Sequence, residues 1–459
     1  MNSLRRTRST ATRTAGRGRP RARASSLLII AAVLALVASA CSSNTKTGSP
    51  TTTTTAANGN SGSSTTVGGG APSPGVTSTS VTVGQVDDLT APLPGLFKGA
   101  EDGTQAYFDY INSTGGVNGR MIHLDAQDSA YSDGTVANAT AAQIKSDFAL
   151  VGGFSLDDAA ETPLVKAAGM PDIAYPLDPN LSNLPTAYSP APNTANDYPL
   201  AIFNILKEKF PAQIKHMGIL WANATASTAS SEKAFERAAT HEGFKIVYDA
   251  GFTPSQTTFL PNVLAMKSKG VQLFFTTQMP DSYSDTLAEE MQQQNFAPVV
   301  VQGDAYSANL IKNGGSAVNK MYLELGYVLY LGADGNQPAV KLFTKWMKEA
   351  DPNANFELQS LYGWASAQLF VQALKDAGST PTRAGLEAAL DKITSFSASG
   401  ILTNGNPAGN VPGDCVLLAQ VQGTQIVRVA PTPSNSFVCT GGNLPAPGFK
   451  PEVRPTPSS

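Results

Sequence analysis

Acidic residues that occur in adjacent pairs are the first candidates for chemistry in this sequence. Asp87-Asp88 follows a short apolar run, and Asp157-Asp158 follows a glycine-rich turn. Two carboxylates act as general acid and general base when they lie across a substrate from one another. Adjacent residues on one strand do not provide that separation. We therefore interpret both pairs as helix caps or solvated loop charges.

Histidine and cysteine residues give no pattern of a metal site or of a nucleophile with its base. His123, His216 and His241 are far apart and in no ligand spacing. The three cysteines are too few for a cysteine-rich zinc module. Neither a Gly-x-x-x-x-Gly-Lys-Ser/Thr phosphate loop nor a Gly-x-Ser-x-Gly elbow occurs. We expect no metal, no cofactor and no enzymatic activity.

Charge is unevenly distributed along the 459 residues, whose formal net charge is -3. The first 40 residues hold eight arginines and no acid, which leaves 24 basic against 35 acidic residues, a net charge of -11, in the rest. An acidic body without a basic stripe argues against nucleic-acid binding. The length and the 41% hydrophobic content allow two or three domains with a sizeable core.

Residues 1–40 have the pattern of an export signal. An arginine-rich segment, 5–23, precedes an apolar segment, 27–37, which is too short to span a bilayer because a span needs about 20 residues. Ala38-Ser39-Ala40 and then Cys41 follow, and they resemble a bacterial lipobox, whose cysteine is lipidated and becomes the mature N-terminus. Leucine is commoner where Ala38 stands. An ordinary cleaved signal with an incidental cysteine is the alternative.

Composition changes sharply after Cys41. Residues 42–80 are almost all Ser, Thr, Gly, Ala, Pro and Asn, which cannot bury enough apolar surface to fold. We expect residues 41–80 to be a lipidated cysteine with a flexible tether, whose mean reach is about 35 Å. The body is then anchored at the extracytoplasmic face of the cell membrane. Residues 440–459 hold five prolines and are expected to form a disordered tail.

Strand and helix patterns alternate through the body. A first series predicts strands at 81–86, 121–126, 148–151 and 172–174, with helices at 97–113, 133–146 and 157–168. A second series predicts strands at 216–220, 244–248, 271–276 and 299–301, with helices at 227–241, 259–269 and 282–294. Two helices at 338–350 and 357–377 and a hairpin at 416–420 and 425–429 follow. Two such series predict an α/β protein with two doubly wound, parallel sheets.

Cys415 and Cys439 lie in this exported body. An oxidising compartment and an even number of cysteines favour a disulfide bond between them. The bond would close a loop of about 24 residues and stabilise the fold by about 3 kcal/mol. Two free buried thiols are the alternative.

Four segments in succession resemble the branched-chain amino-acid-type (Leu/Ile/Val-binding-like) substrate-binding lipoproteins of ABC transporters. The turn Gly115-Gly116-Val117-Asn118-Gly119-Arg120 is similar to the one that leads to the second strand in that family. Segments 132–145, 148–155 and 163–171 are similar to its next helix, its third strand with the first ligand loop, and a following helix end. The likeness covers about residues 81–430.

The resemblance implies a type I periplasmic binding protein fold, in which a hinge closes two α/β lobes around a ligand in the interlobe cleft. Lobe 1 would comprise residues 81–198 with about 330–395 returning. Lobe 2 would comprise residues 199–329 with about 396–439.

The resemblance also implies roles for single residues. Ser155 lies where the family uses a serine to hold the ligand carboxylate, and Asp304 lies where it uses an acid to meet the ligand ammonium. Capping of a helix that starts near Ser307 is the alternative for Asp304. Tyr175 and Pro176 fall in the second ligand loop.

Three further residues are candidates for the opposite wall. Ala226, next to Thr225, stands where several members present an aromatic side chain, so the contact set for an α-amino acid is incomplete. Met279 would line a more apolar pocket or belong to the core.

The function implied is that of the extracytoplasmic solute-binding component of an ABC importer. It would capture a small polar solute, an amino acid or a related amide or carboxylate, and deliver it to a permease. A ligand-sensing receptor lipoprotein of the same fold is the alternative, and a tethered hydrolase is disfavoured because no nucleophile–base pair is visible. We expect a monomer held to the membrane by its lipid.

Overall fold

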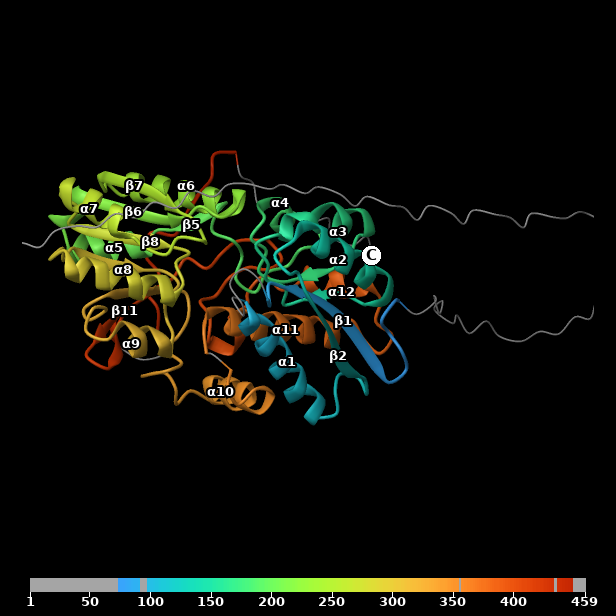
Figure 1. Ribbon diagram of the computed structural model, residues 1–459. Coiled ribbons are helices and arrows are strands. Elements are labelled where there is room, and N and C mark those ends of the chain that lie inside the picture. The colour runs from blue at the N-terminus through green and yellow to red at the C-terminus, as the bar shows by residue number, and fades with distance from the viewer. Residues whose placement is uncertain (1–72, 91–96, 355, 433–435, 449–459) are drawn as a thin grey trace, which may run out of the picture. The chain divides into compact units, whose positions relative to one another are not determined.

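The structure, a computed structural model, describes residues 73–90, 97–354, 356–432 and 436–448, all within one compact unit at 68–459 (Figure 1). The expected signal segment 1–40, the lipidation candidate Cys41 and most of the tether lie outside the described residues. Of the helices in the described ranges, none is both long enough and apolar enough to cross a membrane.

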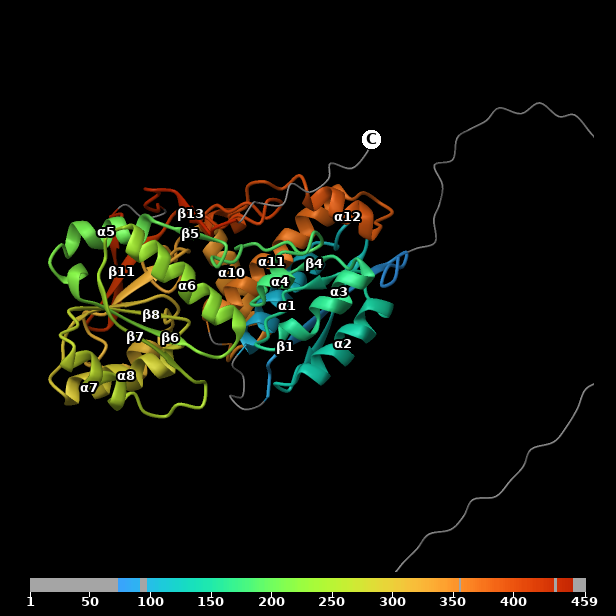
Figure 2. The same cartoon turned by 90° about the horizontal axis from the view of Figure 1, so that it is seen from above.

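The first sheet has four parallel strands in the order β2-β1-β3-β4. They are β1 (Ser80–Asp87), β2 (Met121–Asp128), β3 (Leu150–Val151) and β4 (Asp172–Ile173). The helical segments among and after them are α1 (Lys98–Ser113), α2 (Asp133–Ser146), η1 (Asp158–Ala160), α3 (Thr162–Ala168) and α4 (Pro179–Ser182). Val83 of β1 shares an apolar cluster with Phe108 of α1, whereas a side chain at Gly84 would meet Gln143 of α2. Helices therefore cover both faces of β1 (Figure 2), which explains its nearly continuous burial.

The second sheet has seven strands in the order β12-β11-β10-β9-β8-β6-β7. The parallel strands are β6 (Met217–Ala222), β7 (Ile246–Phe252), β8 (Leu273–Thr277), β9 (Val299–Gln302) and β10 (Tyr322–Leu325), and the antiparallel edge is β11 (Leu417–Gln422) with β12 (Gln425–Ala430). The helical segments are α5 (Ala201–Lys209), η2 (Gln213–His216), α6 (Ala226–His241), α7 (Leu260–Ser268), α8 (Asp281–Gln293) and α9 (Ala308–Gly314). Phe274 packs in the cluster with α7 and α8, and Phe275 packs in the cluster with α5 and α6. This sheet is also covered on both faces.

Three later helices, α10 (Pro338–Ala350), α11 (Leu358–Asp376) and α12 (Arg383–Leu390), return to the first lobe. Helix α11 approaches α1 so closely that only glycine fits at two contact points. A Cβ atom on Gly103 would lie 2.0 Å from the Ser360 carbonyl oxygen, and one on Gly363 would lie 2.0 Å from the Ala100 carbonyl oxygen. This contact fixes the position of Tyr362, the residue before Gly363.

Within the described residues, the chain passes between the lobes three times, at 188–200, 326–337 and 391–416. The second and third crossings lie side by side. The Val328 amide donates to the Ile401 carbonyl at 2.9 Å, and the Thr403 amide donates to the Gly326 carbonyl at 2.8 Å. The third crossing contains η3 (Ala398–Gly400), and the first contains β5 (Asp197–Pro199), which pairs with β13 (Asn443–Pro445).

The predicted fold class, two doubly wound α/β lobes, is confirmed, and each predicted strand and helix has a counterpart. The elements that the sequence patterns did not predict are α4, α5, α12, η2, η3, β5, β10 and β13. Helix α5 has Leu200 as its N-cap residue and therefore no side-chain cap, so its start carries no sequence signal. Strand β10 has only four residues, and Glu324 interrupts its apolar pattern.

The expected boundaries of the body are wrong at both ends. Val76 forms a bridge with Val81, so the fold begins inside the predicted tether. In the predicted disordered tail, Leu444 of β13 pairs with Tyr198 of β5 and packs against the second lobe's apolar cluster. Prolines are tolerated at the edge of such a two-stranded sheet.

The predicted disulfide bond between Cys415 and Cys439 is present. Next to it, Val416 and Val438 form an antiparallel bridge with two backbone hydrogen bonds, of 2.9 and 2.8 Å. The bond therefore attaches the C-terminal segment to the start of β11.

Candidate ligand-binding cleft

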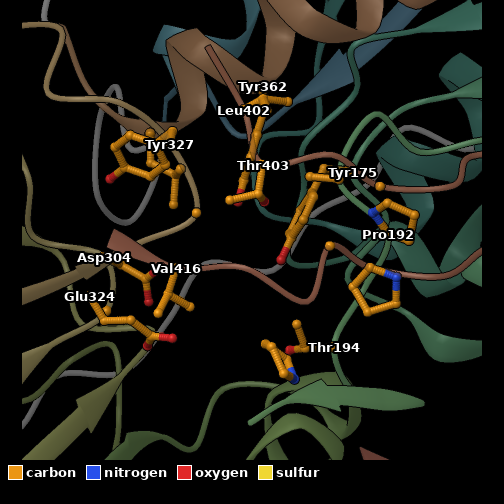
Figure 3. A pocket seen from close by; sticks show the side chains of 18 of the residues that line it. Tyr175, Pro192, Thr194, Asp304, Glu324, Tyr327, Tyr362, Leu402, Thr403 and Val416 are labelled. Atoms are coloured by element: carbon orange, nitrogen blue, oxygen red, sulfur yellow. The ribbon is translucent and has the colours of Figure 1, made fainter. Parts of the chain in front are cut away.

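Two cavities with a shared wall lie between the lobes. The larger has a volume of about 420 Å³ and the smaller, drawn in Figure 3, about 180 Å³. Residues from both lobes line both cavities: Tyr175, Ser231, Gln278, Asp304, Leu358 and Tyr362. We therefore treat the two cavities as parts of one interlobe cleft.

The lining of this cleft begins where parallel strands end. Phe154 and Tyr175 follow β3 and β4 in the first lobe, and Gln278 and Asp304 follow β8 and β9 in the second. Open parallel sheets bind ligands outside the carboxyl ends of their strands. The cavities thus lie where the strand order leads us to expect a ligand.

Aromatic side chains form much of the wall contributed by the first lobe. Tyr175 stacks on Tyr362, with ring centroids 4.4 Å apart and planes inclined by 13°, and on Phe154, with centroids 5.4 Å apart. Eight aromatic residues line the larger cavity: Phe97, Tyr131, Phe154, Tyr175, Phe252, Tyr283, Tyr306 and Tyr362. Their faces offer large contact areas to an apolar ligand body.

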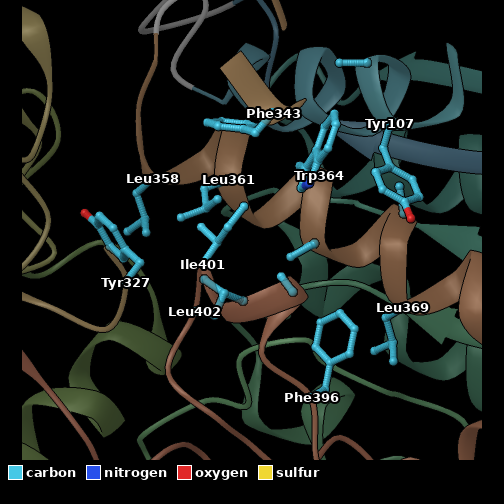
Figure 4. Packing of buried hydrophobic residues seen from close by; sticks show 14 of the residues in the cluster. Tyr107, Tyr327, Phe343, Leu358, Leu361, Trp364, Leu369, Phe396, Ile401 and Leu402 are labelled. Carbon is cyan, nitrogen blue, oxygen red and sulfur yellow. The ribbon is translucent and has the colours of Figure 1, made fainter. Parts of the chain in front are cut away.

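A buried cluster supports this aromatic wall (Figure 4). Trp364 is 1% exposed, and its ring lies 4.8 Å from that of Tyr107 on α1 and 5.4 Å from that of Phe343 on α10. Tyr327, in the second crossing, belongs to the same cluster and lines the smaller cavity. The wall is therefore held by the core of the first lobe rather than by a loop alone.

Two carboxylates face the smaller cavity from the second lobe. Asp304 follows β9 and Glu324 lies on β10; both are half-buried and lie on the same side of the cavity (Figure 3). Burial raises the pKa of Asp304 to about 6. Burial, and secondarily the charge of Asp304, raises the pKa of Glu324 to about 8. The site therefore holds ionisable acids in surroundings that disfavour their charged forms.

Within the described part of the chain, no basic side chain balances these acids. The described residues that line the two cavities include no lysine, arginine or histidine. The described lining consequently offers acidic groups and no cationic partner for them.

The turn that follows β8, the strand beside β9, orients the carboxylate of Asp304. Gln278 has a φ of 57°, which is uncommon for a residue with a side chain. In this conformation its backbone amide donates to Asp304 Oδ2 at 2.6 Å. Among the described residues this is the one hydrogen bond that Asp304 makes, which leaves Oδ1 for a ligand. Capping of α9, the alternative role for Asp304, is performed by Ser307 instead.

Ser155 has a different environment from the one expected of a ligand-carboxylate contact. Its Oγ donates to Asp88 Oδ1 at 2.7 Å, and Asp88 Oδ2 accepts from the Leu156 amide at 2.8 Å. Asp87 Oδ1 accepts from the Phe154 amide at 2.8 Å. Ser155 is not among the residues that line either cavity. Asp87 and Asp88 are 0% and 1% exposed, so the interpretation as solvated loop charges is wrong.

Four other predicted site residues also lie outside the lining of both cavities. The Pro176 carbonyl accepts from Asn193 Nδ2 at 3.2 Å, and Thr225 is the side-chain cap of α6. Ala226 is exposed in the first turn of α6. Met279 is fully buried in the cluster with α7 and α8, so of its two expected roles the structure shows the core one. Of the predicted residues, the cleft brings together Tyr175 and Asp304.

Several lining residues were not predicted. Tyr362 is half-buried in α11 and precedes Gly363, whose close contact with α1 has no sequence signature. Glu324 is the single charged residue in the apolar run Tyr322–Leu325, a signal that sequence reasoning could have used. Tyr327 depends on a chain crossing that the sequence does not reveal.

Two α/β lobes, three crossings and a cleft at the strand ends define a bilobal solute-binding protein. A model of the periplasmic binding protein family matches residues 80–425. The chain therefore belongs to the periplasmic binding protein family, and the resemblance found in the sequence is confirmed. Membership implies a substrate-binding, transport-related role outside the cytoplasm.

Solved structures support the same fold. The fatty acid ABC transporter substrate-binding protein from Thermomonospora curvata is 17% identical, with 80% of this chain and 98% of that chain covered and a TM-score of 0.63. A possible leucine/isoleucine/valine-binding protein from Rhodopirellula baltica is 16% identical, with 77% and 97% covered and a TM-score of 0.66. The branched-chain amino acid transporter substrate-binding protein from Streptococcus pneumoniae, solved with isoleucine, is 16% identical, with 76% and 100% covered and a TM-score of 0.61. A sequence comparison with curated proteins found no match.

Proposed function

We propose that this protein is the extracytoplasmic solute-binding component of an ABC importer and captures a small organic solute in the interlobe cleft. Amino acids and related amides or carboxylates are the starting candidates. The observation that carries the proposal is the single cleft lined from both lobes at the strand ends, in a chain of the periplasmic binding protein family. The named solutes of the solved relatives, fatty acid and isoleucine, support a small organic molecule as the ligand class.

Within the cleft, Asp304 would meet a positively charged group of the ligand, because its Oδ1 is free of protein hydrogen bonds among the described residues. Tyr175 and Tyr362 would contact the ligand body with their ring faces. Ser155 would act indirectly, by positioning Asp88, rather than by holding a ligand carboxylate. The protein would bind its solute without converting it.

Cys41 would carry the lipid that holds the protein to the membrane, and the segment up to residue 74 would tether the body. The partners would be the solute and an ABC permease, and the protein would act as a monomer. The tether, with a mean reach of about 30 Å, would keep the body close enough to the membrane to dock on a permease.

Thermal denaturation of the purified full-length protein with a panel of amino acids, amides, amines and small carboxylates tests the binding role. A ligand that binds only the folded state raises the apparent stability. We expect at least one member to raise the melting temperature and to be recovered unchanged. Loss of uptake of that ligand on deletion of the gene would support transport, whereas normal uptake with a lost cellular response would support the sensing alternative.

A further inference from the structure

We infer that the ligand is an organic amine with an apolar body and without a carboxylate, and that its ammonium group binds between Asp304 and Glu324. This inference rests on the proposed solute-binding function and narrows its ligand class. It differs from the amino-acid ligand that the family resemblance implies.

The first argument is the absence of a partner for the cavity acids. Among the described residues, the Glu324 side chain makes no hydrogen bond or ion pair, and Asp304 accepts a single bond from the Gln278 amide. A carboxylate surrounded by protein is costly unless it is paired or hydrogen-bonded. An ammonium group supplies three donors and a compensating charge. The smaller cavity, of about 180 Å³, is large enough for such a head group.

The second argument is that the place for a ligand carboxylate is already taken. The amides of Phe154 and Leu156 and the hydroxyl of Ser155 donate to Asp87 and Asp88. These donors are therefore satisfied by carboxylates of the chain itself. A second carboxylate, from the ligand, would find no free donor among them.

The third argument is the character of the larger cavity. Its eight aromatic residues provide an apolar lining, and its other charged residues, Asp281 and Glu357, are acids. Aromatic faces attract cations as well as apolar groups. An anionic ligand would thus meet unfavourable electrostatics throughout the cleft, whereas an amine with an aromatic or aliphatic body would match both cavities.

A proton readout follows from the same geometry. The titratable groups around Glu324 are Asp304, Tyr198 and Tyr327, all without positive charge. In the free protein the raised pKa keeps Glu324 mostly protonated at neutral pH. A bound ammonium group favours the ionised carboxylate, so binding should release a proton from Glu324 to the solvent.

The test compares ligand pairs that differ by one carboxylate: tyramine with tyrosine, phenethylamine with phenylalanine, and isoamylamine with leucine. Isothermal titration of the full-length protein at neutral pH, in two buffers of different ionisation enthalpy, gives affinity and proton release. We expect at least one amine to bind about tenfold or more tighter than its amino acid, by analogy with the cost of an unmatched buried charge. We also expect release of a fraction of a proton.

Variants assign the effect to the cavity. Asp304→Asn keeps the shape and an acceptor for the Gln278 amide, and should weaken amine binding by about thirtyfold or more. Glu324→Gln should abolish the proton release. Asp249→Asn removes an exposed acid of the same lobe that lines neither cavity, and should change neither quantity.

The outcomes separate this inference from the proposed function. The inference is overturned, and solute binding is left intact, if the amino acids bind more tightly than the amines. The same holds if a neutral or anionic member of the wider panel binds while no amine does. Binding by no member of that panel overturns both. Amine binding that is indifferent to Asp304→Asn overturns the assigned position of the ammonium group.

Discussion

Replacement of Gly363 by alanine tests how the core of the first lobe positions the cleft. The added Cβ would lie 2.0 Å from the Ala100 carbonyl oxygen and 2.9 Å from Thr104 Oγ1. Backbone of α1 cannot move as a flexible side chain can, so α11 must shift away from α1. Tyr362, the preceding residue, must shift with it and disturb its stacking on Tyr175.

Overpacking of a close contact costs about 1–3 kcal/mol. For a body of this size, each kcal/mol lowers the melting temperature by about 2 °C, so we expect a decrease of about 2–6 °C. The affinity for any cleft ligand should also fall, because a ring displaced from an aromatic wall loses contacts worth about 1 kcal/mol, or about fivefold. Calorimetric denaturation and titration measure the two effects on the same protein.

Gly134→Ala is the matched control. Gly134 is in the first turn of α2, and the nearest atom to an added Cβ is Ser132 Oγ at 3.8 Å. Alanine favours a helix over glycine by up to about 1 kcal/mol, so this variant should be as stable as the parent or more so. If Gly363→Ala were equally well tolerated, the close contact would not set the position of α11, and the explanation for Tyr362 would be wrong.

Three further outcomes are expected. Cys41→Ala should move the protein from the detergent phase to the aqueous phase on partitioning, and equal partitioning with the parent would contradict lipidation. Denatured, unreduced protein should show no thiol labelling at Cys415 and Cys439, and stoichiometric labelling of both would refute the bond in the exported protein. Replacement of the two cysteines by serine should lower the stability by about 3 kcal/mol. It should also weaken ligand binding, because Cys415 lines the smaller cavity. Burial raises the pKa of Asp304 from an unfolded value of 3.8 to about 6, so its ionised form opposes folding above about pH 6. Asp304→Asn should therefore stabilise the ligand-free protein at neutral pH by about 1–3 kcal/mol, and an unchanged or lower melting temperature would contradict this. In the parent protein, amine affinity should fall as the pH drops below about 6.

The sequence predicts the arrangement of this fold better than it predicts the site. Strands such as β1 and β9 are short apolar runs, and local periodicity identifies them without knowledge of their neighbours. Strand order then gives the edge at which ligands bind, and Tyr175 and Asp304 do lie in the cleft there. The strands, and the places in the chain that line the cleft at Tyr175 and Asp304, were therefore predictable from local patterns and one rule of topology.

The direction of individual side chains was less predictable. Met279 and Gln278 are adjacent after β8, yet one is fully buried in the core and the other lines the cleft, because a left-handed turn at Gln278 redirects the chain. Asp88 and Asp304 both follow strands of lobes with similar topology. The Asp88 carboxylate accepts hydrogen bonds from Ser155 and Leu156, whereas the Asp304 carboxylate accepts one bond and faces the cavity. Such differences arise from tertiary contacts that no local pattern encodes.

The crossings between the lobes are tied to one another as well as to the lobes. Backbone hydrogen bonds join the second crossing to the third at Val328 and Thr403. The disulfide bond joins the end of the third, at Cys415, to Cys439, from which the chain continues into β13 and its pairing with β5 in the first. Any rotation of one lobe against the other must therefore bend the three crossings and the C-terminal segment together. The disulfide bond is the one covalent tie in this set within the described residues, and the hydrogen bonds and the β5–β13 pairing hold the same segments besides it.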